Sequence, residues 1–190
     1  MAAVTTTESG AGGGGGAGGA GGAGEQEPVT VRRATRHDMQ HVLDMIQELA
    51  DYEGMPRGPQ LCVRDLIEDG FDSSPAWFFG LVAECGGAMV GHALCNRAYS
   101  SWTRRAFYVE DLFVRPSARR RGVGLRLLQE LCRMAVDEGV HRIDWHVLED
   151  NATALSFYAR LGARDLRVSE GRAALRLDRP HIEQLSRDQL

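Results

Sequence analysis

The spacing of apolar residues changes near residue 35, and the change predicts a strand followed by a helix. Residues 29–34 form a short strand-like run. Thr35 and Asp38 then match a capping box, in which a hydroxyl and a carboxylate satisfy the free amides at a helix start. Apolar residues follow at helical spacing: Met39, Val42, Leu43, Ile46, Leu49 and Ala50. The Gly- and Pro-rich residues 52–59 end this helix.

The middle of the chain reads as an antiparallel meander. A short helix is expected at about residues 63–69, before strand-like runs at 76–84 and 88–99. The glycine pair between these two runs predicts a hairpin. A third run, residues 106–114, ends before Pro116, because proline cannot donate to a strand ladder.

The second half alternates helix and strand. A long helix ends at Gly139, a strand follows at 142–148, and Asn151 starts a helix that Gly162 stops. Two short strands are expected around residues 163–168 and 173–177, followed by a short polar helix. This order predicts an α/β fold with a mixed, mostly antiparallel sheet and helices on both faces.

The first 27 residues do not share this patterning. Residues 10–24 are only glycine and alanine, which offer almost no apolar surface to offset the entropy of ordering. We therefore expect a disordered tail at 1–27 and one domain at 28–190. No basic residue precedes Arg32, so a secretory or mitochondrial signal is not expected, and no run reaches membrane-spanning length. These features predict a cytoplasmic protein without membrane contact.

Composition narrows the chemistry further. The net charge of −4 argues against nucleic acid as the main partner. All 22 basic residues are arginine, which excludes a Walker-type phosphate loop and Schiff-base chemistry, because both need lysine. The four cysteines lack a C-x-x-C pairing and are expected to be reduced core thiols. His37 and His41 stand one helical turn apart without a third ligand, so we expect a solvated helix start and no metal.

The junction Arg119–Gly124, "RRRGVG", stands between the third run and the long helix. Free amides at a helix start, glycines and arginines can together hold a phosphate. A solvated loop explains the same residues equally well. A G-x-G-x-x-G after the first strand is missing, which argues against a nicotinamide cofactor.

Strand, Arg119-x-x-Gly122-x-Gly124 and long helix together resemble the acetyl-CoA motif of the GNAT acetyltransferase superfamily. Over residues 29–177 further segments resemble, in order, its spermidine/spermine and thialysine acetyltransferase branch: IQELADYE, DLIEDGF, YVEDLFV, RRGVG, YARLGARDL and SEG. The resemblance implies a GNAT fold in which two parallel central strands, here EDLFV and RIDWHVL, splay apart around acetyl-CoA.

The resemblance also implies which residues bind acetyl-CoA. Backbone groups of Leu112, Phe113 and Val114 would hold the pantetheine arm as an added strand would. The arginines and the helix start would bind the pyrophosphate: Arg119, Arg120, Arg121, Gly122, Val123, Gly124 and Leu125. Asn151 would contact the cofactor from the other side.

Two residues are candidates for proton transfer. A primary amine has a pKa near ~10 and must lose a proton before it attacks, while the leaving thiolate must gain one. Tyr158 matches the family's catalytic tyrosine, which acts as the general acid. Alternatively, Tyr158 is a core tyrosine without a role in catalysis. Glu110 would bind the ammonium group and accept its proton. Alternatively, Glu110 lies on a solvent-exposed face of the strand. Adjacent strand residues face opposite ways, so Glu110 is chosen over Asp111 by the family match.

The sequence says less about which amine is the substrate. Tyr52 and Glu53 match substrate-facing positions of the branch, and Glu170 is a weaker candidate. Ser100 replaces an acidic residue of polyamine acetylators, and Arg172 adds a cation that would repel a polycation. These departures favour a lysine-like amino acid over spermine.

The sequence therefore predicts an acetyl-CoA-dependent N-acetyltransferase acting on a small primary amine, a diamine, polyamine or thialysine-like amino acid. A protein or peptide N-acetyltransferase and a non-catalytic acetyl-CoA-binding module remain as alternatives. By resemblance alone, a homodimer is expected.

Overall fold

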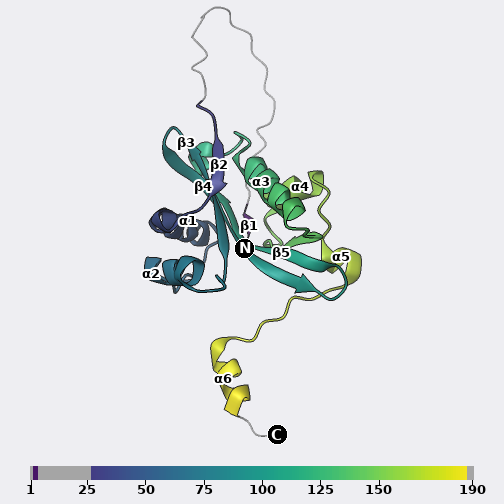
Figure 1. Ribbon diagram of the computed structural model, residues 1–190. Coiled ribbons are helices and arrows are strands. Elements are labelled where there is room, and N and C mark those ends of the chain that lie inside the picture. Colours follow the sequence, from purple (N-terminus) through teal and green to yellow (C-terminus); the bar gives the residue numbers. More distant parts are fainter. Residues whose placement is uncertain (1, 4–26, 188–190) are drawn as a thin grey trace, which may run out of the picture. The chain divides into compact units, whose positions relative to one another are not determined.

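The computed structural model describes residues 2–3 and 27–187 (Figure 1). They fall into two compact units, Met1–Phe157 and Tyr158–Leu190. Ala2 and Ala3, inside the expected tail, form the strand β1 (Ala2–Ala3), and the rest of the tail up to residue 26 lies outside the described residues.

Within the described part of the first unit, six strands form one mixed sheet. The antiparallel meander is as predicted, in the order β5-β4-β3-β2: β2 (Thr30–Arg33), β3 (Phe79–Cys85), β4 (Ala88–Ser100) and β5 (Arg104–Val114). The other edge of β5 has two parallel partners. The strand β6 (Arg142–Trp145) pairs with residues 106–109, and β1 pairs with residues 112–113.

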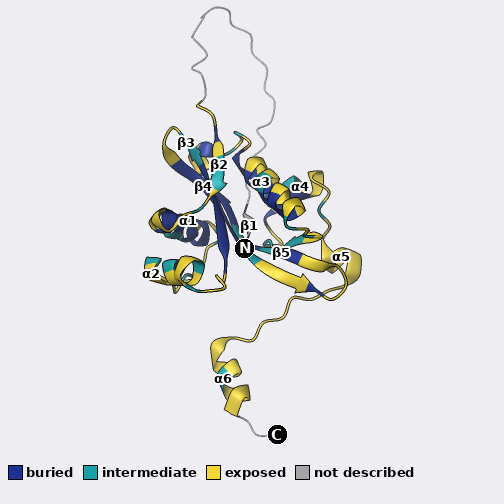
Figure 2. Cartoon of the chain, in the orientation of Figure 1, coloured by how far each residue is buried: buried dark blue, intermediate teal, exposed yellow. Residues whose placement is uncertain are grey.

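Helices cover both faces of this sheet, as predicted. Buried residues of α1 (Met39–Tyr52) share a core cluster with Val82 and Phe113. Gly91 belongs to the opposite face, where a Cβ would lie 3.3 Å from Val123 Cγ1 in α3 (Val123–Asp137). Figure 2 shows β4 buried along most of its length, with α1 and α3 on either side. The sheet core is therefore closed by two amphipathic helices.

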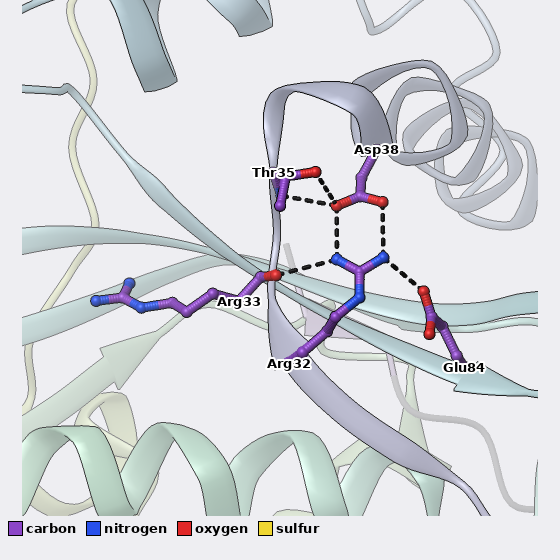
Figure 3. Close-up of polar contacts among 5 residues, drawn as sticks. All are labelled: Arg32, Arg33, Thr35, Asp38 and Glu84. Carbon is purple, nitrogen blue, oxygen red and sulfur yellow. Dashed lines mark hydrogen bonds and ion pairs between the residues drawn. The ribbon is translucent and has the colours of Figure 1, made fainter.

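The predicted capping box is present at the start of the short 3₁₀ turn η1 (Arg36–Asp38), which leads directly into α1. Asp38 accepts hydrogen bonds from the Thr35 amide (2.7 Å) and hydroxyl (2.9 Å). The Arg32 guanidinium donates to both Asp38 oxygens, at 2.7 and 2.8 Å, and also to Glu84 (Figure 3). These contacts hold the pKa of Asp38 well below its usual range, the Arg32 hydrogen bond contributing most. The Arg32 guanidinium thus ties β2, β3 and the entrance of α1 together.

The remaining elements are short. In the first unit they are α2 (Val63–Ile67), the π-helical turn η2 (Glu68–Asp72) and the 3₁₀ turn η3 (Pro116–Ala118). The helix α4 (Ala152–Arg160) starts in the first unit and ends in the second. The second unit also has α5 (Leu166–Glu170) and α6 (Arg179–Arg187). In the described part of the chain, no helix is long and apolar enough to cross a membrane.

The prediction of a strand around residues 163–168 is wrong. The Asp165 carboxylate accepts hydrogen bonds from the amides of Arg167 (2.9 Å) and Val168 (3.4 Å), which starts α5 instead. The strand expected at 173–177 is also wrong: within the described residues this stretch has no strand pairing, and Leu175 is exposed. Alternating apolar residues form a strand only where a partner edge is available.

The expectation that all four cysteines lie in the core is wrong for two of them. Cys95 is buried, whereas Cys62 and Cys132 are exposed. Cys62 precedes α2, and Cys132 is on the outward side of α3. All four thiols are free.

Candidate active site

A β-bulge sets the direction of the acidic residues on β5. Leu94 pairs with Asp111, but the next residue on β4, Cys95, pairs with Val109. Glu110 therefore has no opposite residue, which is the defining feature of a bulge. Glu110 is exposed and Asp111 is half-buried. The simple alternation assumed from the sequence fails at this point.

Asp111 lies close to the end of α1. Asp111 and Phe113 are two residues apart on β5 and so lie on the same face of the sheet, and Phe113 packs in the core cluster with α1. Glu53 follows directly after α1 and is half-buried. Burial raises the pKa of Glu53, and the negative charge of Asp111 raises it further. The structure thus brings together the predicted residue Glu53 and Asp111, which the sequence reasoning set aside.

Arg119 links α1 to the end of β5. Its guanidinium carbon lies 5.2 Å from the centroid of the Tyr52 ring and 6.0 Å from that of Phe113. Its Nε donates to the Val114 carbonyl at 3.0 Å. Burial lowers the pKa of Arg119, but its guanidinium stays protonated at neutral pH. Arg119 therefore positions Tyr52 beside β5.

The other junction residues shape the start of α3. Arg120 and Gly122 both have positive φ, 61° and 76°, and Gly122 is the N-cap. The helix's first hydrogen bond runs from the Arg126 amide to the Gly122 carbonyl, so the amides of residues 123–125 precede it. Arg121 donates to the Glu27 carbonyl at 3.2 Å. Only Arg120 of the three arginines is fully exposed, so a uniformly solvated loop does not describe this junction.

The backbone edge of β5 connects these two regions. Pairing with β6 stops at Val109, which confirms the expected splay of the two parallel strands. Beyond the bulge, residues 112–114 lie between Asp111 and the turn that leads to α3. The pairing of β1 with Leu112 and Phe113 demonstrates that this edge accepts an added strand.

His92 is buried beneath the same site, and the sequence analysis missed it. It is 0% exposed, pairs across the sheet with Phe113, and its ring centroid is 6.3 Å from the Phe113 ring. Neither ring nitrogen has a hydrogen-bond partner among the described residues. Burial lowers the pKa of His92 to about 4, although the charge of Asp111 partly opposes the shift. His92 is therefore neutral at pH 7.

The remaining predicted residues have local roles that the structure defines. Tyr158 in α4 is 4% exposed, and burial raises the pKa of its phenol. The Asn151 side-chain oxygen accepts the Ala154 amide at 3.0 Å and so caps α4. The Ser100 hydroxyl accepts the amides of Trp102 and Thr103, both at 3.2 Å, and so forms the β4–β5 turn.

Two further findings concern charge and metals. In the second unit, Arg172 forms an ion pair with Glu170 at 2.6 Å. His37 and His41 are exposed at the start of the first helix. Among residues 27–187, no group of three or more His, Cys, Asp or Glu side chains is placed to hold a metal.

The chain is similar to known acetyltransferases over most of its length. The family model described as "Acetyltransferase (GNAT) family" matches residues 42–163. Thialysine N-epsilon-acetyltransferase of Sus scrofa is 35% identical over 166 residues, which cover 83% of this chain and 97% of that protein.

Solved structures show the same fold. An integron cassette protein from the mobile metagenome of V. cholerae has a TM-score of 0.69 at 24% identity, covering 84% of this chain and 98% of that chain. An aminoglycoside N-acetyltransferase in complex with CoA has a TM-score of 0.64 at 18% identity, covering 80% and 96% of the two chains. Because the family model spans more than half of the sequence and the Sus scrofa enzyme matches over nearly its whole length, this chain belongs to the GNAT family of acetyl-CoA-dependent N-acetyltransferases.

Proposed function

We propose that the protein transfers an acetyl group from acetyl-CoA to the primary amine of a small cationic substrate, with a lysine-like amino acid preferred over spermine. The observation that carries this proposal is the half-buried pair Glu53 and Asp111: burial raises the pKa of Glu53, and the negative charge of Asp111 raises it further. Two interacting carboxylates that are partly withdrawn from water favour a cation between them. An ammonium group is such a cation.

The residues on the other side of the site fit acetyl-CoA. The edge of β5 at Leu112, Phe113 and Val114 offers main-chain groups to an extended arm, since it already accepts the strand β1. The left-handed turn at Arg120 and Gly122 aims free amides of the α3 start at an anion, and the helix dipole favours a pyrophosphate there. When bound, acetyl-CoA supplies the acetyl group as an activated thioester. The Asn151 side chain caps α4 through its oxygen, which leaves its amide nitrogen as the donor for the cofactor.

Glu110 and Tyr158 have complementary proton-transfer roles in this proposal. Glu110, exposed at the bulge, accepts the proton that the substrate ammonium loses before its nitrogen attacks the thioester carbonyl. As the carbon–sulfur bond breaks, the Tyr158 hydroxyl donates a proton to the sulfur. Burial raises the pKa of Tyr158, so its phenol stays protonated at neutral pH and is ready to donate.

The preference for a small amine rests on charge. Arg172 pairs with Glu170 and neutralises its charge locally, so Glu170 is a poor partner for a polycation. Ser100 carries no charge and forms a turn, so it also offers no anchor for a polycation. Thialysine N-epsilon-acetyltransferase, the relative from Sus scrofa, supports the same substrate class.

The test is a panel of amines incubated with acetyl-CoA and purified protein, with products identified by mass. The panel contains thialysine, lysine, ornithine, putrescine, spermidine and a short peptide. We expect thialysine or a related amino acid to give the highest kcat/KM. With that amine, Asp111→Asn should raise KM by about tenfold, the effect of losing one charge-assisted contact, and leave the KM for acetyl-CoA unchanged.

Asp51→Asn, two residues before Glu53 and exposed, is the matched control and should behave like the wild type. If kcat/KM is tenfold or more higher for spermidine, a difference of roughly 1.4 kcal/mol, the assigned substrate is wrong. Acetylation of the peptide alone would support a protein N-acetyltransferase instead. Binding of acetyl-CoA without turnover of any amine would support a non-catalytic module.

A further inference from the structure

The strand β1 occupies the part of one β5 edge that, among the described residues, β6 leaves unpaired. Ala2 pairs with Leu112 and Ala3 with Phe113, in parallel. On the same edge, β6 pairs only as far as Val109. β1 therefore fills the place on the β5 edge where the two parallel strands have separated.

β1 is paired with β5 through its main chain. The strand is two residues long, whereas β4 and β5 pair along ten aligned positions. A two-residue strand makes few ladder hydrogen bonds, and each contributes only modestly because the same groups bond to water when the strand leaves. Another extended group with alternating donors and acceptors can therefore replace it.

This inference rests on the proposed function, because acetyl-CoA is assigned to the same main-chain groups. Its pyrophosphate is assigned to the α3 start and its thioester to the Asp111 end of β5, so the arm between them must run along residues 112–114. We propose that β1 is an intramolecular competitor of acetyl-CoA, paired with β5 in the cofactor-free protein and displaced when the cofactor binds. One edge of a strand pairs with one partner at a time, so the two occupants exclude each other.

The size of the effect follows from the fraction of molecules in which the edge is open. A site that is open in about a tenth to a third of the molecules binds its ligand about threefold to tenfold more weakly than a fully open site. Because β1 and β5 belong to one chain, this fraction does not change with protein concentration. Bound β1 lowers the affinity for acetyl-CoA and leaves kcat at saturating acetyl-CoA unchanged.

The direct test measures β5 in the absence of the cofactor. Ala2→Pro/Ala3→Pro removes both amide donors of β1, because proline has no N–H. The matched control, Ala11→Pro/Ala17→Pro, places the same two prolines outside β1. All proteins carry a purification tag at the C-terminus, so that the start of the chain is native. Amide hydrogen exchange is then followed in a peptide that covers residues 110–116.

We expect faster exchange in this peptide for Ala2→Pro/Ala3→Pro than for the wild type, with the control indistinguishable from the wild type. Calorimetry with acetyl-CoA should then give a dissociation constant about threefold to tenfold lower for the β1 variant, in line with the open fraction. Equal exchange and equal affinity in all three proteins would overturn the competitor role while leaving the acetyl-CoA site intact. If none of the three binds acetyl-CoA, the proposed function itself fails.

Discussion

At the scale of single residues, the proposed mechanism depends on carboxylates and a phenol whose surroundings change their proton affinity. Burial and the negative charge of Asp111 raise the pKa of the half-buried Glu53, and in the proposed function this negative charge favours a cationic substrate. Tyr158 is buried far enough that its phenol remains neutral at any physiological pH. The sequence identified Tyr158 and Glu53 through a family resemblance. Neither residue type is diagnostic by itself.

Replacement of Tyr158 by phenylalanine tests its role as the general acid. Tyr158→Phe removes only the hydroxyl, so we expect kcat to fall by about a hundredfold or more, the usual range for a lost proton donor. The affinity for acetyl-CoA, measured by calorimetry, should stay within about twofold of the wild type, since the ring is retained. Tyr99→Phe, at a tyrosine that is 76% exposed, is the control. Full activity in Tyr158→Phe would remove this tyrosine from the proposed mechanism.

At the scale of elements, the register between β4 and β5 decides which groups reach the site. At the bulge beside Leu94 and Cys95, Glu110 is exposed and Asp111 is half-buried. Gly91, near the other end of the β4–β5 pairing, lets α3 pack closely on the sheet. A Cβ at Gly91 would lie 2.8 Å from the Phe113 carbonyl oxygen, which is closer than real Cβ contacts allow.

Gly91→Ala should therefore destabilise the protein. The added methyl group meets backbone that cannot easily shift, so we expect a loss of about 1–3 kcal/mol in the free energy of unfolding, as for other overpacked sites. Chemical denaturation measures this change. Ala98→Val, on an exposed position of β4, adds a larger group without this clash and should stay within about 0.5 kcal/mol of the wild type. Equal stability of the two variants would contradict close packing at Gly91.

At the scale of the whole molecule, stability is coupled to pH through a buried histidine. His92 is neutral in the folded state, with a pKa lowered to about 4, whereas an unfolded histidine has a pKa near 6.5. Below pH 6.5 the unfolded chain thus binds a proton that the folded chain does not. The free energy of unfolding should fall as pH decreases from 6.5 toward 4.

Denaturation at pH 7.5 and pH 5 tests this coupling. His92 alone should account for a loss of about 2 kcal/mol between these two pH values. In His92→Phe this part of the loss should disappear, because the ring can no longer be protonated. His141→Gln, at an exposed histidine, should keep it. An unchanged pH dependence in His92→Phe would mean that His92 binds its proton equally well in both states.

Much of the first unit could be predicted because its determinants are local. The Thr35–Asp38 cap, the apolar spacing of α1 and the glycine at the start of α3 act over a few residues, and the structure has them as expected. Local signals failed in the second unit. The carboxylate of Asp165 started a helix where an alternating pattern indicated a strand.

The sequence by itself determined the order of the elements, the helix starts and, through family motifs, the membership in the GNAT family, because caps and periodicity depend on neighbours along the chain. Only the tertiary structure decided that the charge of Asp111 acts on Glu53, that His92 is buried and neutral, and that β1 takes the open edge of β5. These features depend on strand register and on burial between distant segments. Both are set when the sheet pairs and the helices pack, so the order of residues does not reveal them in advance.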